Sequence, residues 1–397
     1  MLKISDRAEF IINRLEENGF QAYTVGGCVR DMLLGKEPFD WDIATSALSQ
    51  TVKKIFDGYD VIPTGIKHGT VTVVLEHEPF EITTFRKEDI YTVHRRPESV
   101  SFVQELAEDL KRRDFTVNAM AYNPQRGLFD FFGGKEDLQA GLIKCVGEPQ
   151  LRFEEDALRI MRALRFASAY GFQIEEQTGL SLRSCAHYLE DISMERINSE
   201  FSKFLLGQGF YQLMQDWADI VYSAVHMPPA AEERLKAVCC APQVLDVRLA
   251  LLFENAETAG KVLKGLKYDN RTIHAVLPIV QRLKEQETEI PAVKKALGVL
   301  GEETYLKLLA TRKAYESAAG TDLGWEHTSS LLEGIIERNE CVSLRQLAVN
   351  GRDINEFAGG ALIGQILNAL LDEVMEEKLP NKKEILMQRA EQLATKH

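Results

Sequence analysis

Hydrophobic positions follow two different spacings along this chain. In the first 150 residues, helical spacing alternates with short runs rich in β-branched residues. Ser5 can cap a helix from Asp6 to about Asn18, and Gly19 ends it, because a polar cap accepts a backbone amide and glycine tolerates a left-handed turn. From Leu151 onward the spacing is almost entirely helical. The pattern predicts a mixed first part and a helical second part.

The remaining expected elements follow from the same pattern and from turn residues. Two apolar runs joined by 76–79 predict a β-hairpin, formed by 69–75 and 80–85. Two more strands are expected at 21–25 and 41–44, and two short helices at 28–34 and 48–56. Later helices are expected at 157–169, 195–206, 231–238, 244–253 and 363–377.

These elements predict an α+β N-terminal head, in which a small mixed sheet carries helices, followed by an all-α C-terminal extension. Glycine and proline breaks suggest four parts. We expect the head to span 1–149, a helical neck 150–206, a helical body 207–310 and a helical tail 311–397.

Composition places the chain among globular proteins. Its 397 residues are 45% hydrophobic and 27% charged, as is typical of that class. No apolar run approaches the roughly 18 residues of a membrane span, and the first residues lack the apolar core of a signal peptide. Six cysteines are scattered without a CxxC pair, which favours reduced thiols and a cytoplasmic location. The sequence leaves the oligomeric state open, a homodimer included.

The formal net charge is −13. This value argues against a protein that coats nucleic acid nonspecifically, since such binding needs a broad basic surface. It does not exclude an enzyme that binds nucleic acid through a local basic face.

Two short motifs in the head suggest a phosphate and metal site. Gly26-Gly27 follows a predicted strand and opens a helix, and bare amides at a helix start suit a triphosphate. Asp40 and Asp42 are two residues apart on a predicted strand, so their side chains are expected on one face. Two neighbouring carboxylates are costly without a cation, and Mg²⁺ prefers oxygen ligands. The alternative for an isolated DxD is a solvated strand end.

Three sequence blocks give the chain a family resemblance. They are Gly26–Gly35 with Asp40-Trp41-Asp42, then Arg112–Ala121, and then Glu155–Arg162. In this order and spacing they resemble the polymerase-β-like nucleotidyltransferases. More narrowly, they resemble the class II CCA-adding enzymes and bacterial poly(A) polymerases. The likeness is good over 20–170 and loose in the C-terminal 190 residues.

The resemblance implies an activity and its partners. The chain would add CCA to the 3′ end of tRNA from CTP and ATP, without a nucleic-acid template, and release pyrophosphate. It implies that Gly27 and Arg30 contact the incoming triphosphate, that Asp40 and Asp42 hold Mg²⁺, and that Arg113 contacts the sugar-phosphate. The neck would select the nucleotide, and the tail would bind tRNA.

The resemblance also implies that Asp156 and Arg159 act as an amino-acid template. Cytosine and adenine both present an amino donor beside a ring-nitrogen acceptor. Aspartate accepts from the first and arginine donates to the second, whereas uracil and guanine present the reverse pattern.

A row of arginines continues from this block. Arg159, Arg162 and Arg165 are spaced by three, which makes them neighbours on a helix surface. The intervening residues are largely apolar, so the helix should be buried, and buried guanidinium groups need anionic partners. We expect a triphosphate to be one, since the three nearby acidic residues would not satisfy them all. A row of surface ion pairs is the alternative.

Three further features are open to two interpretations each. Glu81 is a candidate third carboxylate or an exposed strand residue. The polar segment 86–101 resembles a mobile loop needed for adding the terminal A, or is a plain surface loop; it holds Tyr91, His94, Arg95, Arg96 and Pro97. A basic helix face could meet RNA phosphates or be solvated; it consists of Lys261, Lys264, Lys267 and Arg271.

Other functions remain as alternatives. A poly(A) polymerase shares the head but typically has a more basic C-terminal part. A tRNA nucleotidyltransferase could add only CC or only A. A non-catalytic nucleotide-binding regulator is disfavoured because Asp40 and Asp42 are both present, and the sequence contains no His-Asp dipeptide of an appended phosphohydrolase.

Overall fold

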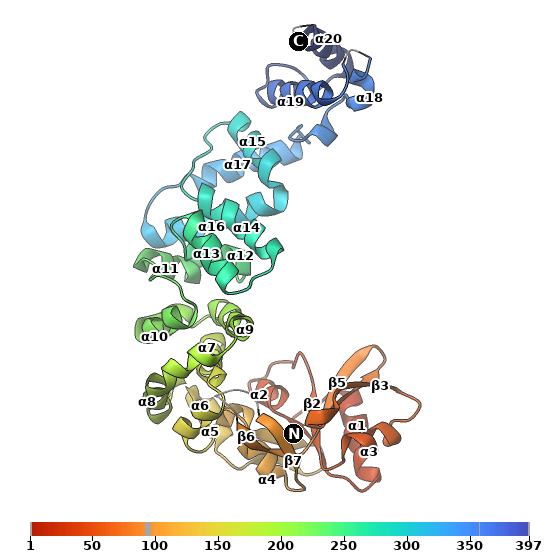
Figure 1. Cartoon of the computed structure of the whole chain (residues 1–397), viewed down its shortest axis with the longest axis vertical. Coiled ribbons are helices and arrows are strands. Elements are labelled where there is room, and N and C mark those ends of the chain that lie inside the picture. The colour runs from red at the N-terminus through yellow and green to blue at the C-terminus, as the bar shows by residue number, and fades with distance from the viewer. Residues whose placement is uncertain (1, 92–96, 357, 396–397) are drawn as a thin grey trace. The chain divides into compact units, whose positions relative to one another are not determined.

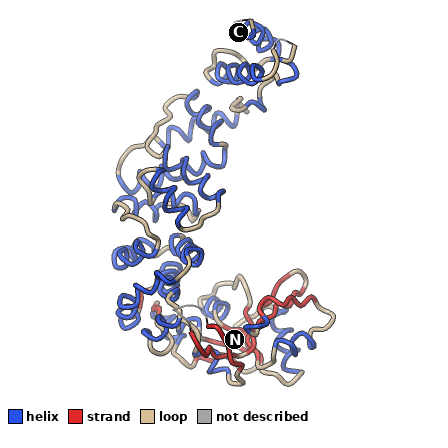
Figure 2. Tube along the Cα trace, viewed as in Figure 1, coloured by secondary structure: helices blue, strands red, loops and turns tan. Residues whose placement is uncertain are grey.

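A computed structural model describes residues 2–91, 97–356 and 358–395 of the chain. These residues form two compact units, Met1–Met227 and Pro228–His397. Within the described residues, strands occur only in the first unit, and the second unit is helical (Figures 1 and 2). The predicted α+β head with a helical extension is confirmed.

A seven-stranded sheet forms the centre of the head, in the order β3-β4-β5-β2-β1-β8-β9. β2 and β5 are parallel, and the other neighbours are antiparallel. The strands are β1 (Ala22–Val25), β2 (Asp42–Thr45), β3 (Asp60–Gly65), β4 (Thr70–Leu75), β5 (Glu78–Thr84), β8 (Met120–Asn123) and β9 (Gly127–Asp130).

Helices of the first unit cover this sheet and continue beyond it. α1 and α3 pack on its strands, and α1 begins at Ser5, whose side chain accepts the amide of Ala8 as expected. The helices are α1 (Asp6–Glu17), α2 (Gly27–Leu33), α3 (Ser49–Ile55), α4 (Leu106–Lys111), α5 (Gly134–Ala140), α6 (Pro149–Glu155), α7 (Leu158–Tyr170), α8 (Glu176–Cys185), α9 (Met194–Leu205) and α10 (Phe210–Ala224). Short 3-10 turns are η1 (Ile66–His68), η2 (Thr116–Asn118) and η3 (Ala186–Asp191).

One face of the sheet carries an apolar cluster that holds α4 against the strands. Leu106 and Leu110 of α4 pack against Tyr23, Val25 and Ala44. Side chains alternate along a strand, so Asp42 lies on the same face as Ala44, one step beyond the apolar cluster. Apolar burial of α4 therefore positions the residues that follow it near the first residue of β2.

Segment 86–101 was expected to be a loop, and this expectation is wrong for the part of the segment that the structure describes. β6 (Arg86–Tyr91) pairs antiparallel with β7 (Pro97–Phe102). His94, Arg95 and Arg96 lie outside the described residues. The many polar residues concealed the strands, because a two-stranded hairpin outside the main sheet needs little apolar alternation.

Three strands of the sheet were not predicted from the hydrophobic pattern. β3 is mostly exposed and contains Pro63, as an edge strand can. β8 is buried at every position, so it shows no alternation, and β9 is half-buried throughout. A second short pair, β10 (Leu142–Ile143) and β11 (Gln173–Ile174), is parallel.

The second unit consists of α11 (Glu232–Cys240), α12 (Leu245–Leu251), α13 (Ala256–Gly265), α14 (Asn270–Arg282), α15 (Ile290–Leu300), α16 (Glu302–Ala319), α17 (Trp325–Glu337), η4 (Leu344–Gln346), α18 (Gly351–Ile354), α19 (Ala361–Met375) and α20 (Lys383–Ala394). α16 packs on α11 and α12, and α19 packs on α20. α16 continues across the expected boundary at 310–311. The four-part division remains a prediction.

The predicted basic helix face is wrong, because its four residues do not belong to one helix. α13 ends before Lys267, whose φ of 61° is left-handed. Asp269 caps a separate helix, α14, by accepting the amide of Thr272, and Arg271 lies on that helix. Lys261 is paired with Glu257 at 2.6 Å. The regular spacing of the four cations suggested one helix, whereas the chain forms two helices joined by a capped turn.

No helix in the described part of the chain is both long and apolar enough to span a membrane.

Gly207 offers a test of the packing that supports α7. A Cβ at this position would lie 2.5 Å from the carbonyl carbon of Ser168, a residue of α7. We expect Gly207→Ala to cost about 1–3 kcal/mol, as overpacking does, and to lower the unfolding temperature by several degrees. Gly265→Ala is the control, because a Cβ there meets nothing within 4 Å. Equal unfolding temperatures for the two variants would contradict this account.

Candidate active site

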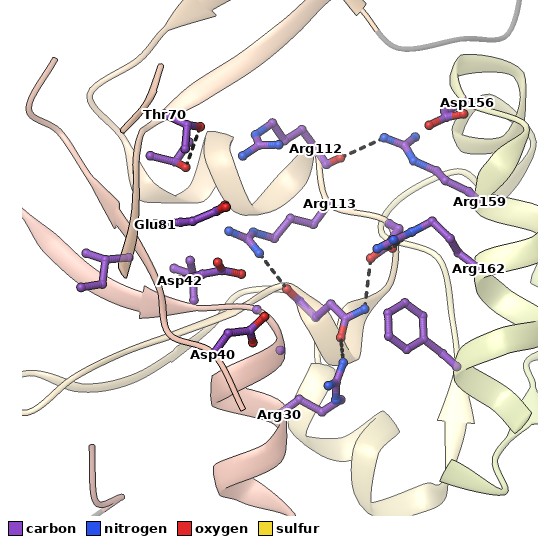
Figure 3. A pocket seen from close by; sticks show the side chains of 18 of the residues that line it. Arg30, Asp40, Asp42, Thr70, Glu81, Arg112, Arg113, Asp156, Arg159 and Arg162 are labelled. Atoms are coloured by element: carbon purple, nitrogen blue, oxygen red, sulfur yellow. Dashed lines mark hydrogen bonds and ion pairs between the residues drawn. The ribbon is translucent and has the colours of Figure 1, made fainter. Parts of the chain in front are cut away.

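A pocket of about 600 Å³ lies in the first unit beside the starts of α2 and β2 (Figure 3). It is lined by residues of the sheet, of α2, of the segment after α4, and of α7. The structure brings every predicted site residue to this one pocket, and Glu81 with them: Gly27, Arg30, Asp40, Asp42, Arg113, Asp156, Arg159, Arg162 and Arg165. Their individual roles remain predictions.

Gly26 makes the turn from β1 into α2 and leaves room for an arginine. Its φ of 76° and ψ of −126° suit glycine. A Cβ at Gly26 would lie 2.6 Å from Nη1 of Arg113. The missing side chain therefore lets the Arg113 guanidinium approach the start of α2. Helix-start amides and this cation together favour an anion.

Arg30 forms the next part of the positive wall and is only 6% exposed. Its Nη1 donates to Oδ1 of Asn118 at 2.6 Å. Its Nε and Nη2 donate to Oδ1 of Asp31 at 3.0 and 2.9 Å. The guanidinium is therefore held in one orientation on the pocket wall.

Asp40, Asp42 and Glu81 lie together near the start of β2 (Figure 3). Asp42 opens β2, and its Cα is in register with that of Glu81 on the parallel strand β5, so the two side chains are neighbours on one face. Asp40 is not on the strand, and that expectation is wrong. It lies in a bend before β2, yet it still lines the pocket. The chain turns at Phe39 and Asp40 because β2 gains its partners only from Asp42 onward.

These carboxylates stand close enough to influence one another. Burial raises the pKa of Asp42 to about 6; Arg113 opposes the shift, while Asp40 and Glu81 add to it. Within the described ranges, no three His, Cys, Asp or Glu side chains are grouped as a ready-made metal cage. A magnesium ion here would therefore need substrate oxygens as well, which is how Mg²⁺ sites with one or two carboxylates are commonly completed.

Asp156 lies between two helices, directly before the helix that was predicted at 157–169 and is observed as α7. α6 ends at Glu155, and Asp156 has extended backbone angles, φ −142° and ψ 101°. Its Oδ1 accepts the amide of Leu158 at 3.2 Å, where α7 begins. Its Oδ2 accepts from Arg196 of α9 at 2.8 Å. Asp156 therefore lies at a helix break, because its short polar side chain competes for backbone amides.

Arg159 is almost fully buried, with 7% exposure. Nη1 donates to the carbonyl oxygen of Arg152 at 2.9 Å and to Glu155 at 2.6 Å. Nη2 donates to the carbonyl oxygen of Arg112 at 3.1 Å. These acceptors fix the guanidinium beside the pocket and connect it to the segment that carries Arg113.

Arg162 and Arg165 have protein carboxylates as partners, and these come from outside the three nearby acidic residues that the sequence offered. Arg162 donates twice to Oδ2 of Asp114, at 2.8 and 2.6 Å. Arg165 Nε lies 3.0 Å from Oε2 of Glu200, without hydrogen-bond geometry. Asp114 and Glu200 are distant in sequence from the row. Counting nearby acidic residues could not find them.

Other pocket residues had received no role from the sequence. Asp114 and Asn118 lie in the block Arg112–Ala121 that carried part of the resemblance, where Asp114 pairs with Arg162 and Asn118 with Arg30. Other polar or aromatic lining residues are Thr70, Thr83, Arg86, Arg112 and Phe166. Alternation along β4 and β5 places Thr70 and Thr83 on the face of Glu81, and their hydroxyls are 3.0 Å apart. This alternation was the sequence signal that could have identified Thr70 and Thr83 as pocket residues.

Comparison with known families covers most of the chain. A model of the Poly A polymerase head domain matches residues 22–144. A model of tRNA nucleotidyltransferase domain 2 matches 247–390. A third, named for an RNA and SrmB-binding site of polymerase A, matches 171–216.

Individual relatives match over nearly their full length. The CCA-adding enzyme of Ligilactobacillus salivarius is 35% identical, with 96% of this chain and 95% of the relative covered. That of Limosilactobacillus reuteri is 36% identical, with 98% and 97% covered. A crystal structure of the Bacillus stearothermophilus CCA-adding enzyme in complex with CTP is 34% identical, with a TM-score of 0.82 and 98% and 97% covered.

The mixed sheet, the carboxylates at β2 and the glycine turn beside them define a class II nucleotidyltransferase of the polymerase-β-like type. Within that class, the chain belongs to the family of CCA-adding enzymes, which are tRNA nucleotidyltransferases. The resemblance read from the three sequence blocks is confirmed.

The Asp114–Arg162 pair gives a pH-dependent prediction. Burial alone would raise the pKa of Asp114, but Arg162, Asn118 and the amide of Phe115 lower it to about 2. A lowered pKa stabilises the fold above the unfolded value of 3.8, and the effect is lost as pH falls through about 2. We expect Asp114→Asn to cost about 2 kcal/mol at pH 7 and about half as much at pH 3.

Urea unfolding between pH 3 and pH 7 would measure this difference. Asp219→Asn is the control, since the Asp219 side chain is 69% exposed and its partner Arg183 is 3.4 Å away. A constant difference between wild type and Asp114→Asn at all pH values would show that the carboxylate charge is not responsible.

Proposed function

We propose that this chain adds C, C and A in turn to the 3′ end of tRNA, using CTP and ATP and releasing pyrophosphate. The observation that carries the proposal is that one pocket is lined by three carboxylates that lie together, by several arginines, and by Asp156 with Arg159. The family membership supports it, because the relatives at 35% and 36% identity are CCA-adding enzymes. A tRNA substrate, CTP and ATP are the partners proposed.

The carboxylates fit a magnesium ion. Asp40, Asp42 and Glu81 offer hard oxygen donors on one side of the pocket, and burial of Asp42 beside two other carboxylates favours a cation there. Asp40 and Asp42 would hold the ion, and Glu81 would be a third carboxylate beside them. Bound Mg²⁺ would help activate the attacking hydroxyl and neutralise the leaving pyrophosphate.

The arginines would bind and orient the incoming nucleotide. Arg30 and Arg113 stand beside the glycine turn, and guanidinium groups bind phosphate oxygens bidentately. Arg162 and Arg165 would contribute long-range attraction to the triphosphate while they remain paired with Asp114 and Glu200. The anion would thus be held by the arginines beside the glycine turn.

Asp156 and Arg159 would select the base. The carboxylate would accept from the amino group of cytosine or adenine, and the guanidinium would donate to the adjacent ring nitrogen. Both side chains are already oriented by protein contacts, through Arg196 for Asp156 and Arg112 for Arg159. Uracil and guanine would place a carbonyl oxygen against the carboxylate.

We also propose a cytoplasmic location, where the six free cysteines would remain reduced. A homodimer and the binding of tRNA by the tail remain predictions.

One assay tests the activity. The protein is incubated with Mg²⁺, single nucleotides or CTP with ATP, and a tRNA lacking its last three nucleotides. We expect two additions with CTP alone and a third when ATP is also present. Long products with ATP alone would indicate a poly(A) polymerase, and products that stop at CC would indicate a partial enzyme.

Removal of one carboxylate tests the metal site. We expect Asp42→Asn to lower the rate of transfer by several orders of magnitude, because charge stabilisation by a metal is worth several kcal/mol. The fold should remain intact, since the change relieves repulsion among three carboxylates. Mg²⁺ should raise the unfolding temperature of wild type and not of the variant. Near-normal transfer by a folded Asp42→Asn protein would exclude the assignment.

Base selection is tested at Asp156. Asparagine can still cap α7 but replaces one acceptor oxygen by a donor. We expect Asp156→Asn to lower kcat/KM for CTP and ATP far more than for UTP and GTP, so that the CTP:UTP ratio falls at least about tenfold. Glu154→Gln is the control, two residues earlier and not on the pocket lining. An unchanged CTP:UTP ratio in folded Asp156→Asn protein would reject the template role.

A further inference from the structure

The last turn of α7 holds two aromatic rings against Arg30. The Cζ of Arg30 lies 5.3 Å from the centroid of Phe166 and 4.7 Å from that of Tyr170. The two aromatic residues are four apart, so they lie on one face of the helix. A guanidinium over aromatic faces is attracted by their electron density. Arg30 of α2 is therefore held by α7 as well as by Asn118.

Tyr170 makes a second contact with the same group of residues. Its hydroxyl donates to Oδ1 of Asp31 at 3.0 Å. That oxygen also accepts both hydrogen bonds from Arg30. Burial raises the pKa of Tyr170 to about 12, so the hydroxyl keeps the proton that it donates. Tyr170 thus orients Asp31, and Asp31 orients Arg30.

Tyr170 acts from outside the pocket. Phe166 is a lining residue, and Tyr170 is not. Lys36 also lies near the Tyr170 ring, with its Nζ 5.0 Å from the centroid. Tyr170 has no direct route to a bound nucleotide, so any effect on the nucleotide would pass through Arg30.

We propose that Tyr170 is a positioning residue that fixes the Arg30 guanidinium toward the triphosphate of the incoming nucleotide. The inference rests on the proposed function, in which Arg30 binds that triphosphate. α7 starts next to Asp156 and carries Arg159, and it ends at Tyr170. One helix therefore orients the base-reading pair at its start and the triphosphate arginine at its end, so that both parts of the nucleotide are aligned together.

The test uses the full chain with Tyr170→Leu and Tyr170→Phe. Tyr170→Leu removes the ring and the hydroxyl, and we expect the Kd and KM for CTP to rise about tenfold, as for loss of a partly buried cation–π contact. Affinity for CMP, which lacks the β- and γ-phosphates, should change less than twofold. Tyr170→Phe keeps the ring and should recover most of the CTP affinity.

Tyr188→Leu is the matched control. Tyr188 lies in η3 of the same unit, its ring centroid is 4.0 Å from that of His187, and it does not line the pocket. Its replacement should leave CTP and CMP affinity unchanged. Unfolding temperatures of all variants show whether any loss of binding is a loss of fold.

A double-mutant cycle with Arg30→Met separates positioning from general stability. If Tyr170 acts through Arg30, Tyr170→Leu should have almost no further effect on CTP affinity in the Arg30→Met background. Equal effects in both backgrounds, or equal losses of CTP and CMP affinity, would overturn the proposal. Failure of wild type to extend tRNA would instead reject the proposed function, and the binding cycle would still report on Tyr170 and Arg30.

Discussion

Charge balance inside one pocket is the constraint on which the rest of this structure depends. Seven arginines and five carboxylates line it, and few of them could be buried without a partner of opposite charge. The partners come from separate segments: Asp114 for Arg162, Glu200 for Arg165, and Arg196 for Asp156. The fold must bring these segments together before the pocket can form.

The placement of the helices follows from this requirement. α7 is apolar on most of its surface and packs against α9 and α10, which brings Arg196 and Glu200 to its charged side. Gly207 permits this close packing, since Ser168 occupies the space of a Cβ. The break at Asp156 gives that carboxylate two donors and leaves it on the pocket wall. Apolar packing and ion pairing therefore specify the same arrangement of helices.

Sequence patterns predicted the features that depend on neighbours in the chain. The cap at Ser5, the glycine turn and the strand that continues from Asp42 are local, and each was found. The edge strand β3, the buried strand β8 and the paired strands β6 and β7 were missed, because pairing with other strands, and not alternation of their own residues, makes them strands. The same reason explains what was missed at the site. Arg162 was identified from the sequence, but its partner Asp114 was not, because the two residues are 48 positions apart in the chain.

A chain with a net charge of −13 must bind anionic substrates through local charge alone. The arginines that line the pocket outnumber its carboxylates, and three of those carboxylates, Asp40, Asp42 and Glu81, lie together, where a cation would offset them. The other two, Asp114 and Asp156, are paired with Arg162 and Arg196. Because the surrounding chain is acidic, nonspecific attraction of RNA should be weak. Selectivity for a nucleotide in the pocket then depends on geometry, which the paired arginines and the helix break keep fixed.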